Sequence, residues 1–244
     1  MKLLTALAAT AAIALPVAAY QASETATPAE AATQGATQLG PMVMTTPGDD
    51  EAPGAVDKSQ VTAGTYEVDP GHTLVTFTVD HLGFSSYTGQ FGNPSGTLVL
   101  DPANPTEAEL NVSFPISAVS TTSEQLDEHL QSEDFFNAAE YPEATFTATD
   151  IFVEGNNAGI RGNLSMAGVT KSVVLQAQFY GAGTNPMSGE PNIGFRATTS
   201  INRSDWGIDY ALPALSDEVL LVIDAAFVKQ GDGAAAPAPT EDEG

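Results

Sequence analysis

The three histidines are the clearest candidates for proton transfer or metal binding in this chain, because imidazole titrates near neutral pH and is a common metal ligand. His72 and His81 lie within the stretch 66–92, and His129 follows later. On an unbroken strand, His72 and His81 would point to opposite faces and lie ~30 Å apart. No His-x-His or His-Glu-x-x-His spacing occurs. We therefore expect no metal site, and interpret His81 as the last inward-facing residue of its strand.

Other catalytic groups are equally sparse. The chain has no cysteine, which excludes disulfides, thiolate metal ligands and cysteine nucleophiles. No Gly-x-Ser-x-Gly elbow is present, and among 31 acidic residues adjacent carboxylates are expected by chance. The sequence thus predicts no catalytic residue and no cofactor. The alternative is a hydrolase or metal-dependent enzyme that uses His72, His81 or His129.

The segment Asn202–Ile208 holds the only tryptophan, Trp206, beside Arg203. In so acidic a chain, an arginine either pairs with a carboxylate or meets an anionic ligand group. Trp206 either closes one end of the fold or contacts a ligand. Both alternatives remain open for both residues.

The charge balance restricts the partners. Seven basic residues stand against 31 acidic ones, which gives a net charge of −24. Such a surface repels a phosphate backbone, so nucleic-acid binding is nearly excluded, and attraction to anionic lipid headgroups is disfavoured.

The chain divides into four parts. Residues 1–19 combine Lys2, an apolar run and Val17-Ala18-Ala19, as in a cleavable signal peptide, and the run is too short for a membrane span. Residues 20–61 are rich in Ala, Thr and Pro and predict a disordered acidic linker, as residues 231–244 predict a tail. One folded domain, 62–230, remains. Export without cysteine favours the bacterial periplasm.

The pattern within the domain is mostly β. Apolar and polar residues alternate in strands that are separated by turns rich in Gly, Pro, Asn and Asp. The expected strands are Leu74–Leu82, Gly96–Leu100, Ala108–Ile116, Thr145–Val153, Gly159–Met166, Ser172–Tyr180, Ile193–Ile201 and Val219–Val228. One helix is expected near Thr121–Leu130, because Thr121 and Glu124 have capping-box spacing. About eight strands with one apolar face each favour an antiparallel barrel over a two-sheet sandwich.

The presumptive inner faces are apolar and carry few ionisable groups. A small barrel either fills its interior with side chains or leaves room for one apolar ligand. Small inward residues such as Ala108, Ala148, Ala177 and Ala197 leave space. The pattern alone does not separate a ligand-binding barrel from a plugged structural or adhesion module.

An ordered set of motifs is similar to the YceI-like family of exported proteins. The motifs are Tyr66-Glu-Val-Asp69-x-x-His72, Phe77-x-Val79-x-His81-Leu-Gly83-Phe84, Gly89-x-Phe91, Ser120-Thr-Thr, Leu130-x-Ser132-x-Asp134-Phe135-Phe136, Tyr141-Pro142-x-Ala-Thr-Phe146, Gly162-Asn-Leu164-x-Met-x-Gly168-Val-Thr170 and Arg203-Ser-Asp-Trp206-Gly207. The resemblance covers about 65–228, and it departs at Trp206, where the family usually has Phe. It implies an eight-stranded, lipocalin-like barrel with one or two short helices, whose cavity holds a polyisoprenoid such as a quinone or prenyl phosphate. It also implies periplasmic residence, no stable membrane insertion and often a homodimer.

We accordingly expect a non-enzymatic carrier. Its candidate ligand-binding residues line the barrel, and His81, Arg203 and Trp206 are the candidates for the polar end of the ligand. The full set is Val75, Phe77, Val79, His81, Leu110, Val112, Phe114, Phe146, Leu175, Phe179, Phe195, Arg203, Trp206 and Ile223.

Overall fold

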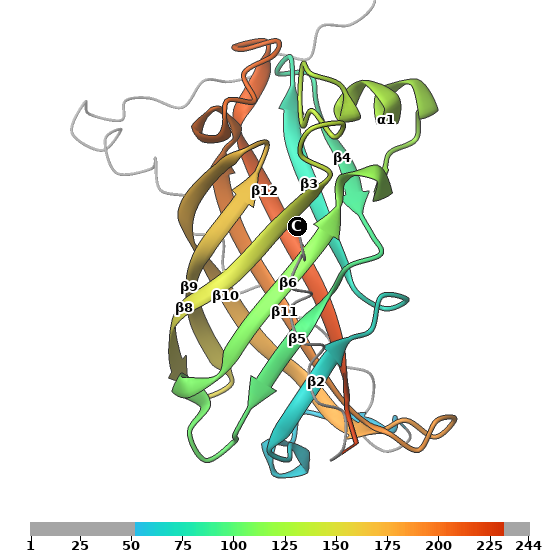
Figure 1. The fold of residues 1–244 in the computed structure, drawn as a ribbon, viewed down its shortest axis with the longest axis vertical. Helices are drawn as coiled ribbons and strands as arrows, with labels where there is room; N and C mark the ends of the chain where they lie inside the picture. Colours follow the sequence, from blue (N-terminus) through green and yellow to red (C-terminus); the bar gives the residue numbers. More distant parts are fainter. Residues whose placement is uncertain (1–51, 232–244) are drawn as a thin grey trace, which may run out of the picture. The chain divides into compact units, whose positions relative to one another are not determined.

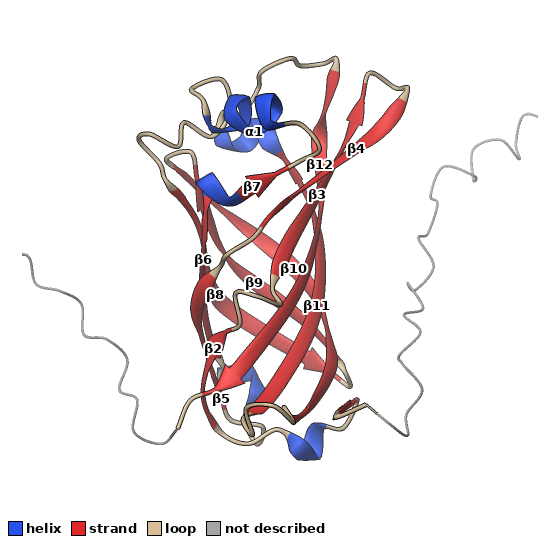
Figure 2. Ribbon diagram, turned by 90° about the vertical axis from the view of Figure 1, so that its right-hand side faces the viewer, coloured by secondary structure: helices blue, strands red, loops and turns tan. Residues whose placement is uncertain are grey.

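A computed structural model describes residues 52–231. The expected signal peptide, most of the expected linker and the tail from residue 232 lie outside the described residues. The described chain forms a long β-barrel with α1 at one end and the short 3-10 helix η1 at the other (Figures 1 and 2). We call these the α1 end and the η1 end.

The strands match the expected ones to within a few residues, and the structure adds several. They are β1 (Gly54–Ala55), β2 (Gly64–Val68), β3 (Leu74–His81), β4 (Ser85–Phe91), β5 (Ser95–Leu100), β6 (Glu109–Pro115), β7 (Val119–Ser120), β8 (Glu143–Glu154), β9 (Asn157–Met166), β10 (Val169–Thr184), β11 (Pro191–Asn202) and β12 (Leu215–Lys229). The helices are α1 (Glu124–Gln131) and the 3-10 turns η1 (Lys58–Gln60), η2 (Pro105–Glu107), η3 (Ile116–Ala118) and η4 (Arg203–Trp206).

Eight antiparallel strands close the barrel. The ring runs β2-β5-β6-β8-β9-β10-β11-β12 and returns to β2. Towards the α1 end, β12 pairs with β3 in place of β2. β3 in turn forms a hairpin with β4. Closure leaves no long unpaired edge within the ring. The expected eight-stranded antiparallel barrel is thus confirmed.

His72 lies in the turn between β2 and β3 and not on a continuous strand. The expected strand begins at Leu74, as observed, but the single unbroken strand assumed for the separation of His72 and His81 is wrong, because this turn lies between them. Thr73 explains the bend, because its hydroxyl donates to the Ala226 carbonyl and accepts from the Ala226 amide. The Thr73 side chain thus satisfies the backbone N–H and C=O of Ala226 on β12, at the point where the backbone between β2 and β3 turns away from that strand.

Strand alternation supplies the apolar interior. On β12, Val219, Leu221, Ile223, Ala225 and Phe227 all face inward, as period two requires. On β8 the register shifts between Ala148 and Asp150. Because a bulge adds one residue, the inward parity changes there, and Ile151 and Val153 continue the inner face begun by Phe146.

Two phenylalanine rings lie against glycines of neighbouring strands. A Cβ on Gly162 would come within 2.3 Å of the Phe146 ring, and one on Gly89 within 2.3 Å of the Phe77 ring. The missing side chains let both rings lie along the wall of the barrel. Less of the interior is therefore filled than the size of the rings suggests.

The helix begins two residues later than expected. Ser123, not Thr121, is its N-cap, and the Ser123 hydroxyl accepts a hydrogen bond from the Leu126 amide. Thr121 instead donates its own amide to Asp127, and its hydroxyl accepts from the Ser123 amide. Thr121 therefore organises the turn before the cap, and the capping-box interpretation is wrong.

Residues before the expected boundary at 62 also take part in the fold. β1 pairs with β10 through Gly54 and Ala55, and Val61 is buried in a cluster with Tyr66 and Phe227. Gly183 makes this pairing possible, because a Cβ there would meet the Pro53 carbonyl at 2.1 Å. Composition gave no sign of this, since residues 53–60 form a strap across the η1 end with little apolar surface of their own.

Candidate binding cavity

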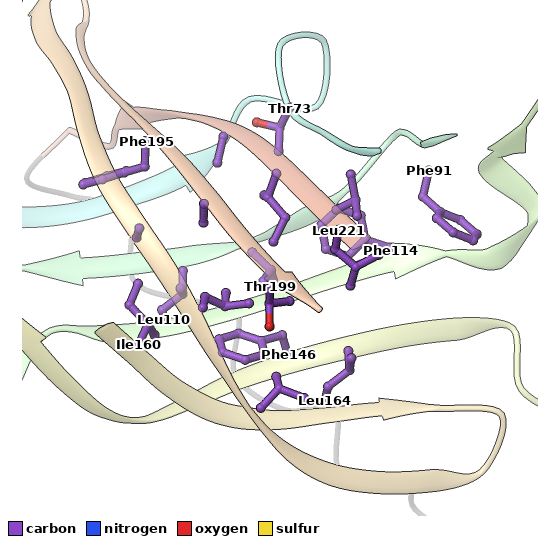
Figure 3. Close-up of a pocket in the computed structure, with 18 of the residues that line it drawn as sticks. Thr73, Phe91, Leu110, Phe114, Phe146, Ile160, Leu164, Phe195, Thr199 and Leu221 are labelled. Atoms are coloured by element: carbon purple, nitrogen blue, oxygen red, sulfur yellow. The ribbon is translucent and has the colours of Figure 1, made fainter. Parts of the chain in front are cut away.

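A single continuous cavity of about 620 Å³ occupies the barrel interior. Its lining comes from every strand of the ring and from both ends of the barrel, and it is mostly aliphatic and aromatic. Figure 3 shows Leu110, Phe114, Phe146 and Leu221, from three strands, directed towards the same space. The volume is in the range of sites that enclose a whole small ligand. The barrel interior is therefore hollow and not filled by the protein's own side chains.

Thirteen of the fourteen candidate residues line this cavity. Those on the strands are Val75, Phe77, Val79, His81, Leu110, Val112, Phe114, Phe146, Leu175, Phe179, Phe195 and Ile223, and the thirteenth is Arg203. Several of the inward side chains, among them Phe77, Phe114 and Ile223, are only half-buried although they face the barrel axis. Half-burial at an inner position indicates that the interior is hollow. Their contact with a ligand remains a prediction.

The α1 end is lined by apolar side chains that are not among the residues expected to line the cavity. Leu126 and Leu130 of α1 line it, followed by Phe135 and Phe136. Phe136 packs edge-on against Phe91 with ring centroids 5.4 Å apart. The one-turn spacing of Leu126 and Leu130 was a signal that could have found them, because it gives α1 an apolar stripe that must be covered.

Arg203 has a structural role at this end. Its side chain is 6% exposed. Its guanidinium donates to the carbonyls of Ser216, Ile208 and Tyr210 at 2.9 Å, and to that of Leu215 at 3.4 Å. Burial lowers the pKa of Arg203, while Asp217 and Asp209 act in the opposite direction. Of the two alternatives for Arg203, a direct pair with an acid is not formed; four backbone carbonyls use most of the guanidinium donors instead.

Asp217 stabilises the 3-10 turn η4, which begins at Arg203. The Ser204 amide donates to one Asp217 oxygen at 2.9 Å and the Ser204 hydroxyl to the other at 2.7 Å. These hydrogen bonds lower the pKa of the Asp217 carboxyl, with a smaller contribution from the Arg203 charge.

Trp206 is the one candidate residue outside the lining. It is 3% exposed, packs with Met166, Ile208 and Val219, and donates its indole N–H to the Leu164 carbonyl at 3.1 Å. Its ring thus fills the wall behind the cavity, which agrees with the interpretation as a closing residue and not as a ligand contact.

The three histidines lie in different surroundings. His72 is exposed and lies 2.7 Å from Asp69, and His81 lines the cavity at the rim of the α1 end. His129 lies 2.9 Å from Asp134 and packs edge-on against Phe135 of the segment after α1 and Tyr210 of the loop after η4. Across residues 52–231, no three His, Asp or Glu side chains are grouped as metal ligands.

The η1 end has a different lining. Lys58, Asn156 and Asn157 line the cavity here together with Pro102 and Pro105 of the loop between β5 and β6. The Lys58 ammonium donates to the Gly155 carbonyl at 3.0 Å. Sequence reasoning missed Lys58, because it falls in the segment expected to be a linker.

Comparisons with known proteins agree with this architecture. A family model described as "YceI-like domain" matches residues 66–227. Protein YceI of Salmonella arizonae is 38% identical over 170 residues, which is 69% of this chain and 88% of that protein. The described part of the chain has no helix long and apolar enough to cross a membrane.

Solved structures give the same fold. The Campylobacter jejuni YceI protein is 32% identical, with a TM-score of 0.56 over 62% of this chain and 90% of that one. Burkholderia cenocepacia BcnA is 20% identical, with a TM-score of 0.57 over 65% and 98% of the two chains. A polyisoprenoid-binding domain from Saccharophagus degradans is 16% identical, with a TM-score of 0.53 over 68% and 98%. The last two show likeness of fold alone.

Proposed function

The chain belongs to the YceI-like family, and we propose that it is an exported, non-enzymatic protein that holds a polyisoprenoid or similar amphiphilic lipid inside its barrel. The continuous apolar cavity of about 620 Å³ carries this proposal. Each ~100 Å² of lipid tail removed from water contributes roughly 2.5 kcal/mol. A long apolar tail therefore gains enough to offset the cost of its immobilisation.

The quinone and prenyl-phosphate classes are the proposed ligands. Both join a long branched tail to a compact polar end, which suits an elongated apolar cavity with polar groups at its ends. The Saccharophagus degradans domain of the same fold is described as polyisoprenoid-binding, which supports this class. The proposed purpose is transport, storage or sequestration of the lipid.

The proposed compartment is the periplasm. Residues 1–19 support it, because they have the charge, apolar run and small residues of a cleavable signal. A homodimer is part of the same proposal, and sedimentation velocity of the purified protein tests it.

The enzymatic alternative has less support. His72, His81 and His129 belong to separate elements, and two of them each lie next to one aspartate. General acid-base or metal chemistry needs several such groups that converge on one reacting atom. Elemental analysis and esterase assays of a His→Ala series test this alternative, and a retained metal or a lost activity would favour it.

The direct test of lipid binding is mass spectrometry of organic extracts from natively purified protein. We expect wild type to carry an isoprenoid lipid, and Ala177→Phe, whose new ring enters the cavity, to carry at most a tenth as much. Val174→Phe is the matched control, because Val174 lies on the outer face of the same strand and is exposed. Wild-type protein that carries no lipid and takes up no added isoprenoid would overturn the proposal.

A further inference from the structure

The two ends of the cavity differ in exposure, and this difference indicates where a ligand's polar end lies. Six exposed residues of the lining gather at the η1 end: Lys58, Pro102, Val153, Gly155, Asn156 and Asn157. At the α1 end, His81 is the exposed lining residue in the described chain, and Arg203, Leu130 and Ile208 are buried. The η1 end is thus the wetter end of the cavity.

The hydrogen-bonding groups at the two ends also differ in availability. At the α1 end, the Arg203 guanidinium is engaged by four backbone carbonyls. At the η1 end, Lys58 makes one exposed bond to the Gly155 carbonyl. An ammonium group has three donors, so two remain for a ligand.

No carboxylate within residues 52–231 forms an ion pair with Lys58. Its neighbour Asp57 accepts instead from the Ser59 amide at 2.9 Å and the Ser59 hydroxyl at 2.7 Å. Among the described residues, none therefore neutralises the Lys58 charge by direct contact, although the protein as a whole is strongly acidic. Such a group attracts a hydrogen-bond-accepting oxygen.

From these contacts we infer that the ligand's polar end lies at the η1 end, where Lys58 donates to an oxygen of its headgroup and the tail extends towards α1. Asn156 and Asn157, which follow Gly155 in the chain, add amide groups to the lining of the same opening. This inference rests on the proposed function and places the headgroup away from Arg203 and Trp206. Lys58 precedes residue 66, the first residue matched by the family model, so the contact belongs to this chain's own N-terminal strap.

The headgroup chemistry is an oxygen acceptor, which either a quinone carbonyl or a phosphate supplies. Three probes with a tail of one length separate these sources: geranylgeranyl diphosphate, a quinone with a geranylgeranyl tail, and the hydrocarbon phytane. Affinities are measured on delipidated full-length protein for wild type and Lys58→Ala. Lys171→Ala is the matched control, because Lys171 is an exposed lysine of β10 outside the lining.

We expect Lys58→Ala to lose about fivefold to tenfold in affinity for the diphosphate and about twofold to threefold for the quinone, because a charged acceptor strengthens the bond. Phytane affinity should not change, and Lys171→Ala should match wild type for all three probes. The diphosphate effect should shrink as salt is raised. Lys58→Arg, which keeps the charge and donors, should restore most of the loss.

Equal affinities of wild type and Lys58→Ala for both headgroup probes would overturn the inference and leave the proposed function standing. An equal loss for phytane would also overturn it, because Lys58 would then act on the tail or the strap. Failure of wild type to bind any probe would overturn the proposed function, and this inference with it.

Discussion

The α1 end and the η1 end of one barrel show two different uses of rare polar residues. At the α1 end, Arg203 and Trp206 are buried, and their donors are bonded to backbone carbonyls. At the η1 end, Lys58 and two asparagines are exposed and line the cavity opening. The rarity of a cationic residue in the sequence therefore does not tell whether it stabilises the fold or is available to a ligand. The number of its backbone hydrogen-bond partners and the exposure of its side chain distinguish the two roles.

The largest expected difference between the ends is in stability. Arg203→Ala leaves four carbonyls without their donor, and should lower the free energy of unfolding by on the order of 4 kcal/mol. Lys58→Ala removes one exposed bond and should change it by less than about 0.5 kcal/mol. Urea titration followed by circular dichroism measures both. Equal urea midpoints for the two variants would contradict the structural role of Arg203.

Trp206→Phe tests whether the indole supports the wall and not the ligand. The substitution removes the bond to the Leu164 carbonyl, and we expect a loss of about 1–2 kcal/mol in stability. Because Trp206 is outside the lining, the lipid content per folded protein should not change. A variant of wild-type stability with reduced lipid would move Trp206 into the binding site.

A substitution at the N-cap of α1 tests whether this helix, whose Leu126 and Leu130 line the cavity, moves when lipid exchanges. Ser123→Ala removes the acceptor for the Leu126 amide and should cost about 1 kcal/mol. Gln125→Ala, at an exposed position of α1 outside the cavity lining, is the control. If the α1 end is a fixed closure, Ser123→Ala should leave the lipid exchange rate unchanged, and faster exchange would identify α1 as a moving lid.

The smallest expected effect is the pH dependence that Asp217 contributes. Its pKa is lowered from the usual 3.8 in the folded protein, so the folded state binds fewer protons than the unfolded state. The resulting stabilisation is complete well above pH 3.8 and is lost as pH falls through 3.8 and then through the lowered pKa. Asp217→Asn should therefore show a shallower loss of stability than wild type between about pH 5 and about pH 2. Parallel curves in urea titrations would contradict this assignment.

Much of the barrel and its inner surface could be predicted from the sequence. Alternation assigned Val75, Val112 and Ile223 to the interior, because a period of two leaves only two faces and one must be buried. The motif resemblance supplied the family. Residue spacing failed at two places. The helix cap was misplaced at Thr121, whose amide bonds to Asp127, and the turn at His72 depends on the hydrogen bonds of Thr73 to Ala226, about which periodicity gives no information.

By itself, the sequence determined the fold class, the inward residues and the absence of thiol chemistry, since these depend on residue type and short-range period. Only the tertiary structure decided that the interior is hollow, because volume depends on how rings such as Phe146 lie over Gly162 of the next strand. It also decided the roles of the cations. Arg203 bonds to carbonyls 5 to 13 residues further along the chain, which the loop after η4 folds back around its guanidinium. Lys58 bonds to the Gly155 carbonyl, 97 residues away, and neither set of partners follows from the residue pattern.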